Sequence, residues 1–143
     1  MKRLAFAILA LALTSGLAGA EDKIAATLYK QPGCQCCDAY ADYLRENGFD
    51  VVVLERGEAR NAVPSVRKDL RGCHSTMIDK YVIEGHVPVG PIKRLLAEKS
   101  DIKGISLPDM PQGSPGMSGT KQGPFKILSI PDGEGPAPVY MTE

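Results

Sequence analysis

The sequence lacks an excess of charge of either sign and any apolar run as long as a membrane span. Its 143 residues carry 17 basic and 17 acidic side chains, a formal net charge of zero. Without a positive surplus there is no electrostatic footprint for nucleic acid or anionic lipid, so we expect neither as a partner. The apolar run at residues 4–13 is shorter than the roughly 20 residues that cross a bilayer. We therefore expect no transmembrane anchor.

Residues 1–20 instead have the three parts of a secretory signal peptide. Lys2 and Arg3 precede the apolar run, and small residues that end with Ala18-Gly19-Ala20 follow it. Removal of these two of the 17 basic residues leaves 15 against 17 acidic ones, a net charge of −2. No cysteine follows the cleavage site, so no lipid anchor is expected. The prediction is a periplasmic protein without stable membrane association, which begins at Glu21.

The chain has only four cysteines, and three of them stand within four positions. Cys34, Cys36 and Cys37 lie between a strand-like and a helix-like run, and Cys73 is followed directly by His74. Disulfides persist outside the cytoplasm, so two structural bridges are one interpretation. The adjacent Cys36 and Cys37 disfavour it, because structural bridges usually close long loops. A strand-to-helix turn favours thiolates, which attack disulfides and bind soft metals.

Hydrophobic patterns predict an α/β chain. The predicted elements are strands at 23–29 and 49–54, helices at 36–47, 63–71 and 88–99, and hairpin strands at 75–78 and 81–85. Strand 49–54 is apolar almost throughout, which indicates a buried strand parallel to the first. A βαβ unit followed by a ββα unit is the order of the thioredoxin-like fold. In that fold the first helix faces the loop before the hairpin, which predicts that Cys73 and His74 lie beside the Cys34 loop.

The C-terminal part of the chain differs in composition. Residues 104–123 are rich in Gly, Pro and Ser and show no helical or strand period, which predicts an irregular loop. Residues 125–130 alternate as a strand does, and residues 137–141 are predicted to pair with them. We expect a single domain at 21–143, with its core at about 23–100, this Gly/Pro/Met loop and short C-terminal strands at 125–141.

Two chemistries compete for the sulfurs. Cys34 and Cys37 form a C-x-x-C motif at a helix N-terminus, which is typical of dithiol–disulfide oxidoreductases. Cys36 is a competing thiol inside that motif, and Cys73-His74 stands where thioredoxins carry a Thr-Pro pair. Four thiols and an imidazole fit a metal site better, with Cu(I), zinc or an iron–sulfur cluster as candidates. Adjacent cysteines bridge neighbouring ions more readily than they share one tetrahedron, which favours multinuclear Cu(I).

Four motifs, in the same order, resemble the CopG-like family of periplasmic copper-resistance proteins. They are Cys34-x-Cys36-Cys37 after Tyr29-Lys30, Cys73-His74-Ser75-Thr76, the stretch from Tyr81 to Pro88, and the stretch from Met110 to Met117. The resemblance covers about residues 25–117 and implies a thioredoxin-like fold with a multinuclear copper–thiolate cluster. It also implies interconversion of Cu(I) and Cu(II) in copper resistance. This chain departs from the family at Gln35, where the family usually has Gly.

The resemblance implies a role for each sulfur-bearing residue. Carried over by position, the cluster ligands and redox-active groups are Cys34, Cys36, Cys37 and Cys73. Met110 and Met117 are either thioether ligands that close over the cluster or apolar cover.

The two histidines have open roles. His74 is a ligand, a proton acceptor or a packed histidine under the loop. His86 precedes the last helix, where a surface or capping role is favoured over contact with copper. Tyr29, Tyr40, Tyr43 and Tyr81 are interpreted as core or rim residues.

Three functions follow from this set. A copper oxidoreductase starts from a reduced site with low-pKa thiolates, which release protons on binding Cu(I) and pass between copper-bound and disulfide states. A copper shuttle or storage protein uses the same ligands without catalysis. A dithiol oxidoreductase uses Cys34 and Cys37 alone. Copper ions are the expected partners, with periplasmic copper-efflux and other copper-resistance proteins as candidate protein partners.

Overall fold

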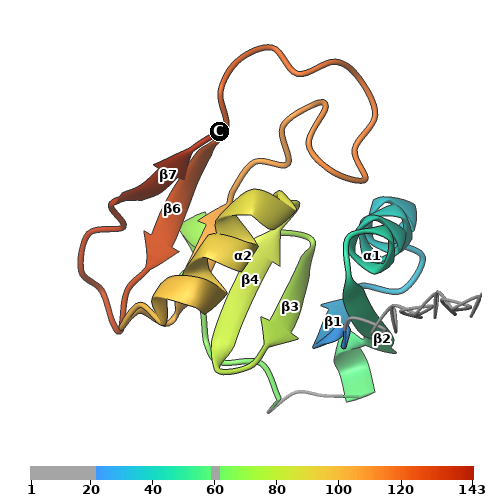
Figure 1. Ribbon diagram of the computed structural model, residues 1–143, viewed down its shortest axis with the longest axis horizontal. Coiled ribbons are helices and arrows are strands. Elements are labelled where there is room, and N and C mark those ends of the chain that lie inside the picture. Colours follow the sequence, from blue (N-terminus) through green and yellow to red (C-terminus); the bar gives the residue numbers. More distant parts are fainter. Residues whose placement is uncertain (1–21, 59–61) are drawn as a thin grey trace, which may run out of the picture.

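Seven strands form one mixed sheet in the computed structural model, which describes residues 22–58 and 62–143 (Figure 1). Their order across the sheet is β2-β1-β3-β4-β5-β6-β7. The strands are β1 (Ile24–Lys30), β2 (Phe49–Glu55), β3 (His74–Ile78), β4 (Tyr81–Gly85), β5 (Gly104–Leu107), β6 (Lys126–Ile130) and β7 (Val139–Thr142). The helices are α1 (Gln35–Glu46) and α2 (Val89–Glu98). The predicted signal peptide at 1–20 lies outside the described residues.

The first three elements form the predicted βαβ unit. β1 pairs with β2 in parallel, with Ile24 opposite Phe49, and α1 makes the crossover between them. The buried residues of α1 recur at i, i+3, i+4 and i+7, which is the period of one helical face. They are Cys37, Tyr40, Ala41 and Leu44. The cysteine loop therefore stands where β1 ends and the helix begins.

β3 and β4 form the predicted hairpin. They pair antiparallel through a two-residue turn, with Ile78 opposite Tyr81, and Asp79 takes the positive φ of 53° that the turn needs. β3 also pairs antiparallel with β1, where Lys30 lies opposite His74. This register brings the residues before β3 level with the residues after β1. Segments far apart in the sequence therefore meet at one edge of the sheet.

The two faces of the sheet carry different cores. Both helices contribute to one apolar cluster, which includes Tyr40 of α1, Ile92 of α2 and Leu28 of β1. A smaller cluster on the other face contains Val66, Leu70, Val82 and Ile130. The alternation of side chains along β4, where Val82 and Ile83 belong to different clusters, follows the two-residue period of a strand.

The prediction of a helix at 63–71 is wrong. Only Lys68–Leu70 forms a single 3₁₀ turn, and Arg67 before it is extended, with ψ of 143°. Side chains donate to two of the backbone carbonyls that a helix would have used, one from the distant Lys103 and one from Arg71 at the end of the segment. Lys103 Nζ donates to the carbonyl of Ser65 (2.8 Å), and Arg71 Nε donates to that of Val66 (2.6 Å). The segment therefore lies across the sheet as an extended strap.

The prediction that residues 104–123 lack a strand is also wrong. Residues 104–107 form β5, which pairs parallel with β4 and antiparallel with β6. The strand has only four residues, Gly104–Leu107, and all are buried. It is therefore too short to show the sustained alternation of apolar and polar residues by which a half-exposed strand is recognised. The strands at 126–130 and 139–142 pair antiparallel as expected.

The α/β class is thus confirmed: residues 22–58 and 62–143 form a mixed seven-stranded sheet with two α-helices. Within the described ranges, no helix is both long enough and apolar enough to cross a membrane. After β5 the chain, drawn in orange in Figure 1, arches back toward α1 before it enters β6.

Candidate metal centre

The cysteine loop places three sulfurs at the start of α1. Cys34 is the N-cap residue, and it makes no side-chain hydrogen bond to the helix, so its sulfur is not used for capping. Cys36 and Cys37 lie in the first turn. Cys37 is fully buried, whereas Cys34 and Cys36 are half-buried. A disulfide joins Cys34 to Cys37.

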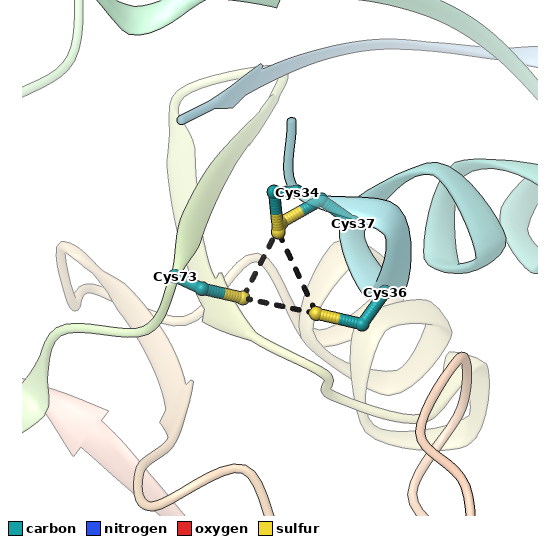
Figure 2. Close-up of side chains that lie close together, drawn as sticks. All are labelled: Cys34, Cys36, Cys37 and Cys73. Atoms are coloured by element: carbon teal, nitrogen blue, oxygen red, sulfur yellow. Dashed lines mark hydrogen bonds between the residues drawn. A yellow bond between two sulfur atoms is a disulfide. The ribbon is translucent and has the colours of Figure 1, made fainter. Parts of the chain in front are cut away.

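Cys73 meets these sulfurs from the far side of the sequence. Its Sγ lies 3.4 Å from that of Cys37 and 4.0 Å from that of Cys36. The Sγ atoms of Cys34 and Cys36 are 3.5 Å apart. Figure 2 shows the resulting triangle, with the disulfide, Cys36 and Cys73 at its corners. The predicted convergence of the two motifs is therefore confirmed.

The oxidation state of the sulfurs differs from the expectation of four free thiolates. Cys36 and Cys73 are free, and Cys34 and Cys37 are oxidised. Two structural bridges, the alternative interpretation, are also wrong, because only one of the two pairs is bonded. Burial, and then the neighbouring Cys36, raise the pKa of the Cys73 thiol to about 12. A low-pKa thiolate is thus the wrong expectation for Cys73, which is not at a helix N-terminus.

Two buried imidazoles complete the site. His74 Nδ1 and His86 Nε2 each lie 3.3 Å from the Cys73 sulfur, and both residues are fully buried. Burial, and then the neighbouring His86, lower the pKa of His74 to about 3. Burial likewise lowers the pKa of His86. Both rings are therefore neutral at pH 7 and have one nitrogen lone pair each.

The tautomer of His86 follows from its second hydrogen bond. Its Nδ1 lies 2.7 Å from the carbonyl oxygen of Pro115. A carbonyl only accepts, so Nδ1 carries the proton and Nε2 presents its lone pair to the Cys73 sulfur. His74 Nε2, in contrast, is buried and has no hydrogen-bond partner among the described residues.

Sequence reasoning placed His86 at the surface or at a helix cap, and the structure corrects this. A usable signal was the hairpin register. The two-residue turn pairs Ile78 with Tyr81 and Ser75 with Glu84. Continuing that register by two residues sets Cys73 opposite His86. Counting residue pairs along the hairpin would therefore have predicted that His86 lies beside Cys73.

Close packing of the backbone at Gly72 against Gly85 holds Cys73 near His86. A Cβ added to Gly72 would clash with the Cα and N atoms of Gly85. The glycines that precede Cys73 and His86 therefore lie against each other, and the two functional residues follow side by side. The Gly72 N–H donates to Glu84 Oε2 at 2.9 Å.

The Gly/Pro/Met loop covers the site but leaves its two methionines in different positions. A Cβ on Gly116 would lie 2.7 Å from Tyr40 N and 2.9 Å from Cys36 O, so the loop touches the first turn of α1. Met117, next to it, is half-buried, and its N–H donates to the carbonyl of Ser114. Met110 is 38% exposed. Met117 is therefore the more buried of the two, and both remain predictions as ligands.

The tyrosines have mixed surroundings. Tyr40 is fully buried, its hydroxyl donates to the carbonyl of Val87 (2.7 Å), and its ring lies 4.6 Å from that of His74. Tyr29 and Tyr81 are also buried, whereas Tyr43 is half-buried. The Tyr40 ring therefore packs against both imidazoles, with its centroid 5.3 Å from that of His86.

The donor atoms form two overlapping groups that can hold a metal. The four cysteine sulfurs lie within 4.8 Å of one another, and so do the donors of Cys73, His74 and His86. Cys73 belongs to both groups. Sulfur-rich sets with imidazole suit Cu(I) and zinc, and the fully buried lone pair of His86 fits a metal ligand. Use of all four sulfurs requires reduction of the Cys34–Cys37 bond.

Comparisons with known proteins support this interpretation. The family described as "Protein of unknown function, DUF411" matches residues 70–117, which include Cys73, both histidines and both loop methionines. A solved structure of "Copper resistance protein copG", form 2, is 31% identical with a TM-score of 0.72. It covers 85% of this chain, and 98% of its own chain is covered. Form 1 is 30% identical with the same TM-score and coverage. A search of curated proteins found no match.

Proposed function

This chain belongs to the CopG-like family of copper-resistance proteins, and on that premise we propose that it binds copper as a multinuclear Cu(I)–thiolate cluster. The ligands in this proposal are Cys34, Cys36, Cys37 and Cys73, together with His74 and His86. Met117, and Met110 after a movement of the loop, are further thioether ligands.

The observation that carries the proposal is the position of Cys73. Its sulfur lies within 4.0 Å of two cysteine sulfurs and 3.3 Å of two imidazole nitrogens. A thiolate with such neighbours can bridge several ions, whereas one tetrahedral zinc uses only four donors. The raised pKa of Cys73 means that copper must displace its proton, so binding is expected to release protons and to weaken at low pH.

We further propose that copper is a redox substrate of this site. Reduction of the Cys34–Cys37 disulfide to two thiols takes two electrons and two protons. Oxidation of two Cu(I) ions to Cu(II) supplies those two electrons. The disulfide and the free thiols would then be two states of one set of sulfurs, and the buried imidazoles would hold the Cys73 side of the site in both.

The setting of this activity is part of the proposal. The order β2-β1-β3-β4, with β3 antiparallel to its neighbours and α1 crossing between β1 and β2, supports a thioredoxin-like assignment for one domain at 21–143. Export by the peptide at 1–20 would place the site in the periplasm beside other copper-resistance proteins. N-terminal sequencing of the exported protein tests the cleavage before Glu21.

Two other functions remain as alternatives. A copper shuttle or storage protein would bind copper at the same residues without changing its valence. A dithiol oxidoreductase is favoured by one observation, the Cys34–Cys37 disulfide at the start of α1. The free sulfurs of Cys36 and Cys73 count against it, because they lie 3.5 Å from Cys34 Sγ and 3.4 Å from Cys37 Sγ and would compete for the disulfide.

Anaerobic titration of the reduced protein with Cu(I) separates these functions. We expect more than one ion per chain, with loss of all four reactive thiols and no comparable uptake of zinc. Addition of Cu(I) to the oxidised protein, in which the Cys34–Cys37 disulfide is intact, should yield Cu(II) and two new thiols if the site is an oxidoreductase, and no Cu(II) if it only stores copper. Binding of a single equivalent would reject the multinuclear cluster. Reduction of insulin disulfides, inhibited by copper, would favour the dithiol oxidoreductase.

A further inference from the structure

A buried acidic residue lies on the opposite face of the sheet, behind the metal centre. Glu84 of β4 is 1% exposed, and it shares its face with Val82 rather than with the helix-side core. Its Oε1 accepts from the Ser75 hydroxyl at 2.5 Å, and its Oε2 accepts from the Gly72 N–H at 2.9 Å. Arg56 donates to the same hydroxyl at 2.7 Å. The carboxylate is thus placed by polar partners and not by solvent.

The Gly72 contact matters because of its position in the chain. Gly72 precedes Cys73 directly, and its packing against Gly85 leaves no room for a side chain that could anchor the segment. Its backbone N–H is therefore an available anchor, and Glu84 holds it. The residue after Gly85 is His86, so the stretch 84–86 at the end of β4 supplies both the carboxylate and an imidazole that contacts Cys73.

We propose that Glu84 is a positioning residue for the metal centre: by holding the Gly72 N–H it sets the Cys73 sulfur between the cysteine loop and the two imidazoles. This inference rests on the proposed function for its copper readout but not for its structural one. The carboxylate touches no sulfur and is not a ligand. It acts through the backbone, as outer partners of metal ligands commonly do, and loss of such partners typically weakens metal binding about 10- to 100-fold.

Substitutions at residue 84 separate its shape from its charge. In Glu84→Gln the side-chain oxygen can still accept from Gly72, while the amide donates to Ser75, so the anchor is retained. Glu84→Leu removes both hydrogen bonds. Glu84→Asp keeps the charge but is one methylene shorter, so it withdraws from Gly72 and provides a polar variant should the leucine variant fail to fold.

Ser106→Ala is the matched control. Ser106 is buried on β5 directly opposite Glu84 in the register, and its hydroxyl donates to the carbonyl of Leu70 at 2.6 Å. It ties the same strap to the same face of the sheet, but two residues earlier. Its loss should lower the melting temperature without moving Cys73.

The first readout needs no copper. In the metal-free protein with the Cys34–Cys37 disulfide intact, Cys36 and Cys73 are the two free thiols, and their Sγ atoms lie 4.0 Å apart. A fluorogenic bis-alkylating reagent such as dibromobimane then reports whether Cys73 stays within bridging distance of Cys36. We expect at least a tenfold slower cross-linking for Glu84→Leu and Glu84→Asp, and rates within about threefold of wild type for Glu84→Gln and Ser106→Ala. The second readout is Cu(I) affinity by chelator competition, with losses of about 10- to 100-fold for the first two variants.

Two results would overturn the inference. One is wild-type cross-linking in whichever of Glu84→Leu and Glu84→Asp folds. The other is a loss in Ser106→Ala as large as in those variants, because it would assign the effect to general loosening of the strap. If the wild-type protein binds no copper, the proposed function fails, while the cross-linking rates still decide the role of Glu84.

Discussion

The metal centre has two halves that are built in different ways. The loop half, Cys34 to Cys37, is local in sequence and half-exposed apart from Cys37. The hairpin half consists of Cys73, His74 and His86, and both of its imidazoles are fully buried. The loop half carries most of the sulfur and the one disulfide, whereas the hairpin half is fixed by hydrogen bonds that the Glu84 carboxylate and the Pro115 carbonyl accept. In the proposed function, the loop half therefore supplies the redox chemistry and the hairpin half supplies the geometry.

The largest expected effect comes from removing the sulfur that joins the halves. Cys73→Ser should reduce Cu(I) binding to no more than one ion per chain, because the sulfur touches two cysteines and two imidazoles. Cys34→Ser is the matched change in the loop half and should retain part of the copper, since the Cys73 sulfur still lies beside Cys36, Cys37 and both imidazoles. Anaerobic titration with thiol counting measures both.

Circular dichroism is the control for these two variants. Cys73 is only half-buried, so we expect its serine variant to keep the wild-type fold. Full copper stoichiometry in folded Cys73→Ser, or an equal loss in Cys34→Ser, would contradict the division into two unequal halves.

Acid should affect the hairpin half before the loop half. The folded-state pKa of His74 is about 3, below its ordinary 6.5, so folding favours the neutral ring. Its contribution to the unfolding free energy is complete above pH 6.5 and is lost as the pH falls toward 3, by up to about 1.4 kcal/mol per pH unit. The lowered pKa of His86 acts in the same direction.

The measurement is urea unfolding of metal-free protein between pH 6.5 and 4.5. His74→Gln should have a shallower slope than wild type, because one titrating ring is gone. Glu84, whose pKa burial raises, acts in the opposite direction and is common to both proteins. Identical slopes would mean that His74 is not buried as a neutral ring.

Most of the fold could be predicted from the sequence because its elements carry local periods. The α1 face and the β1–β2 pair follow from patterns that any observer can count along the chain. The strap at 63–71 could not, because the side chains of Arg71 and of the distant Lys103 bond its backbone carbonyls, and no local hydrophobic period shows these contacts. β5 was missed because four buried residues show no period.

The sequence predicted the positions of the four cysteines in the site, but not the disulfide or His86. The convergence of Cys73 with the loop followed from element order alone. The disulfide did not, because spacing permits several pairings among four sulfurs. His86 was undervalued because its role depends on the hairpin register and on the Pro115 carbonyl, which comes from a loop 29 residues further along.

The covering loop links the halves, and Gly116 tests that link. Pro115 accepts from His86 in the hairpin half, while Gly116 packs on the first turn of α1 in the loop half. Gly116→Ala puts a Cβ at φ of +79° and 2.7 Å from Tyr40 N, a backbone atom that cannot move aside alone. We expect about 1–3 kcal/mol of destabilisation in urea unfolding, with faster proteolysis of the loop.

Gly123→Ala is the control for this change. An added Cβ at Gly123 meets nothing within 4 Å, so its effect should stay within about 0.5 kcal/mol. Equal stability of the two alanine variants would show that the loop does not rest on α1.

The smallest expected effect belongs to the rim of the loop half. Lys30 Nζ lies 2.6 Å from the Asp38 carboxylate in the first turn of α1, and the Asp38 side chain is 52% exposed. Solvent and salt screen such a pair, so Asp38→Asn should cost less than about 1 kcal/mol and should cost even less at high salt. Copper stoichiometry should not change, because the carboxylate positions the helix start and not a sulfur. A stoichiometry that fell with the charge would mean that the loop half, too, depends on placement by polar contacts, and the contrast between the halves would then be one of degree.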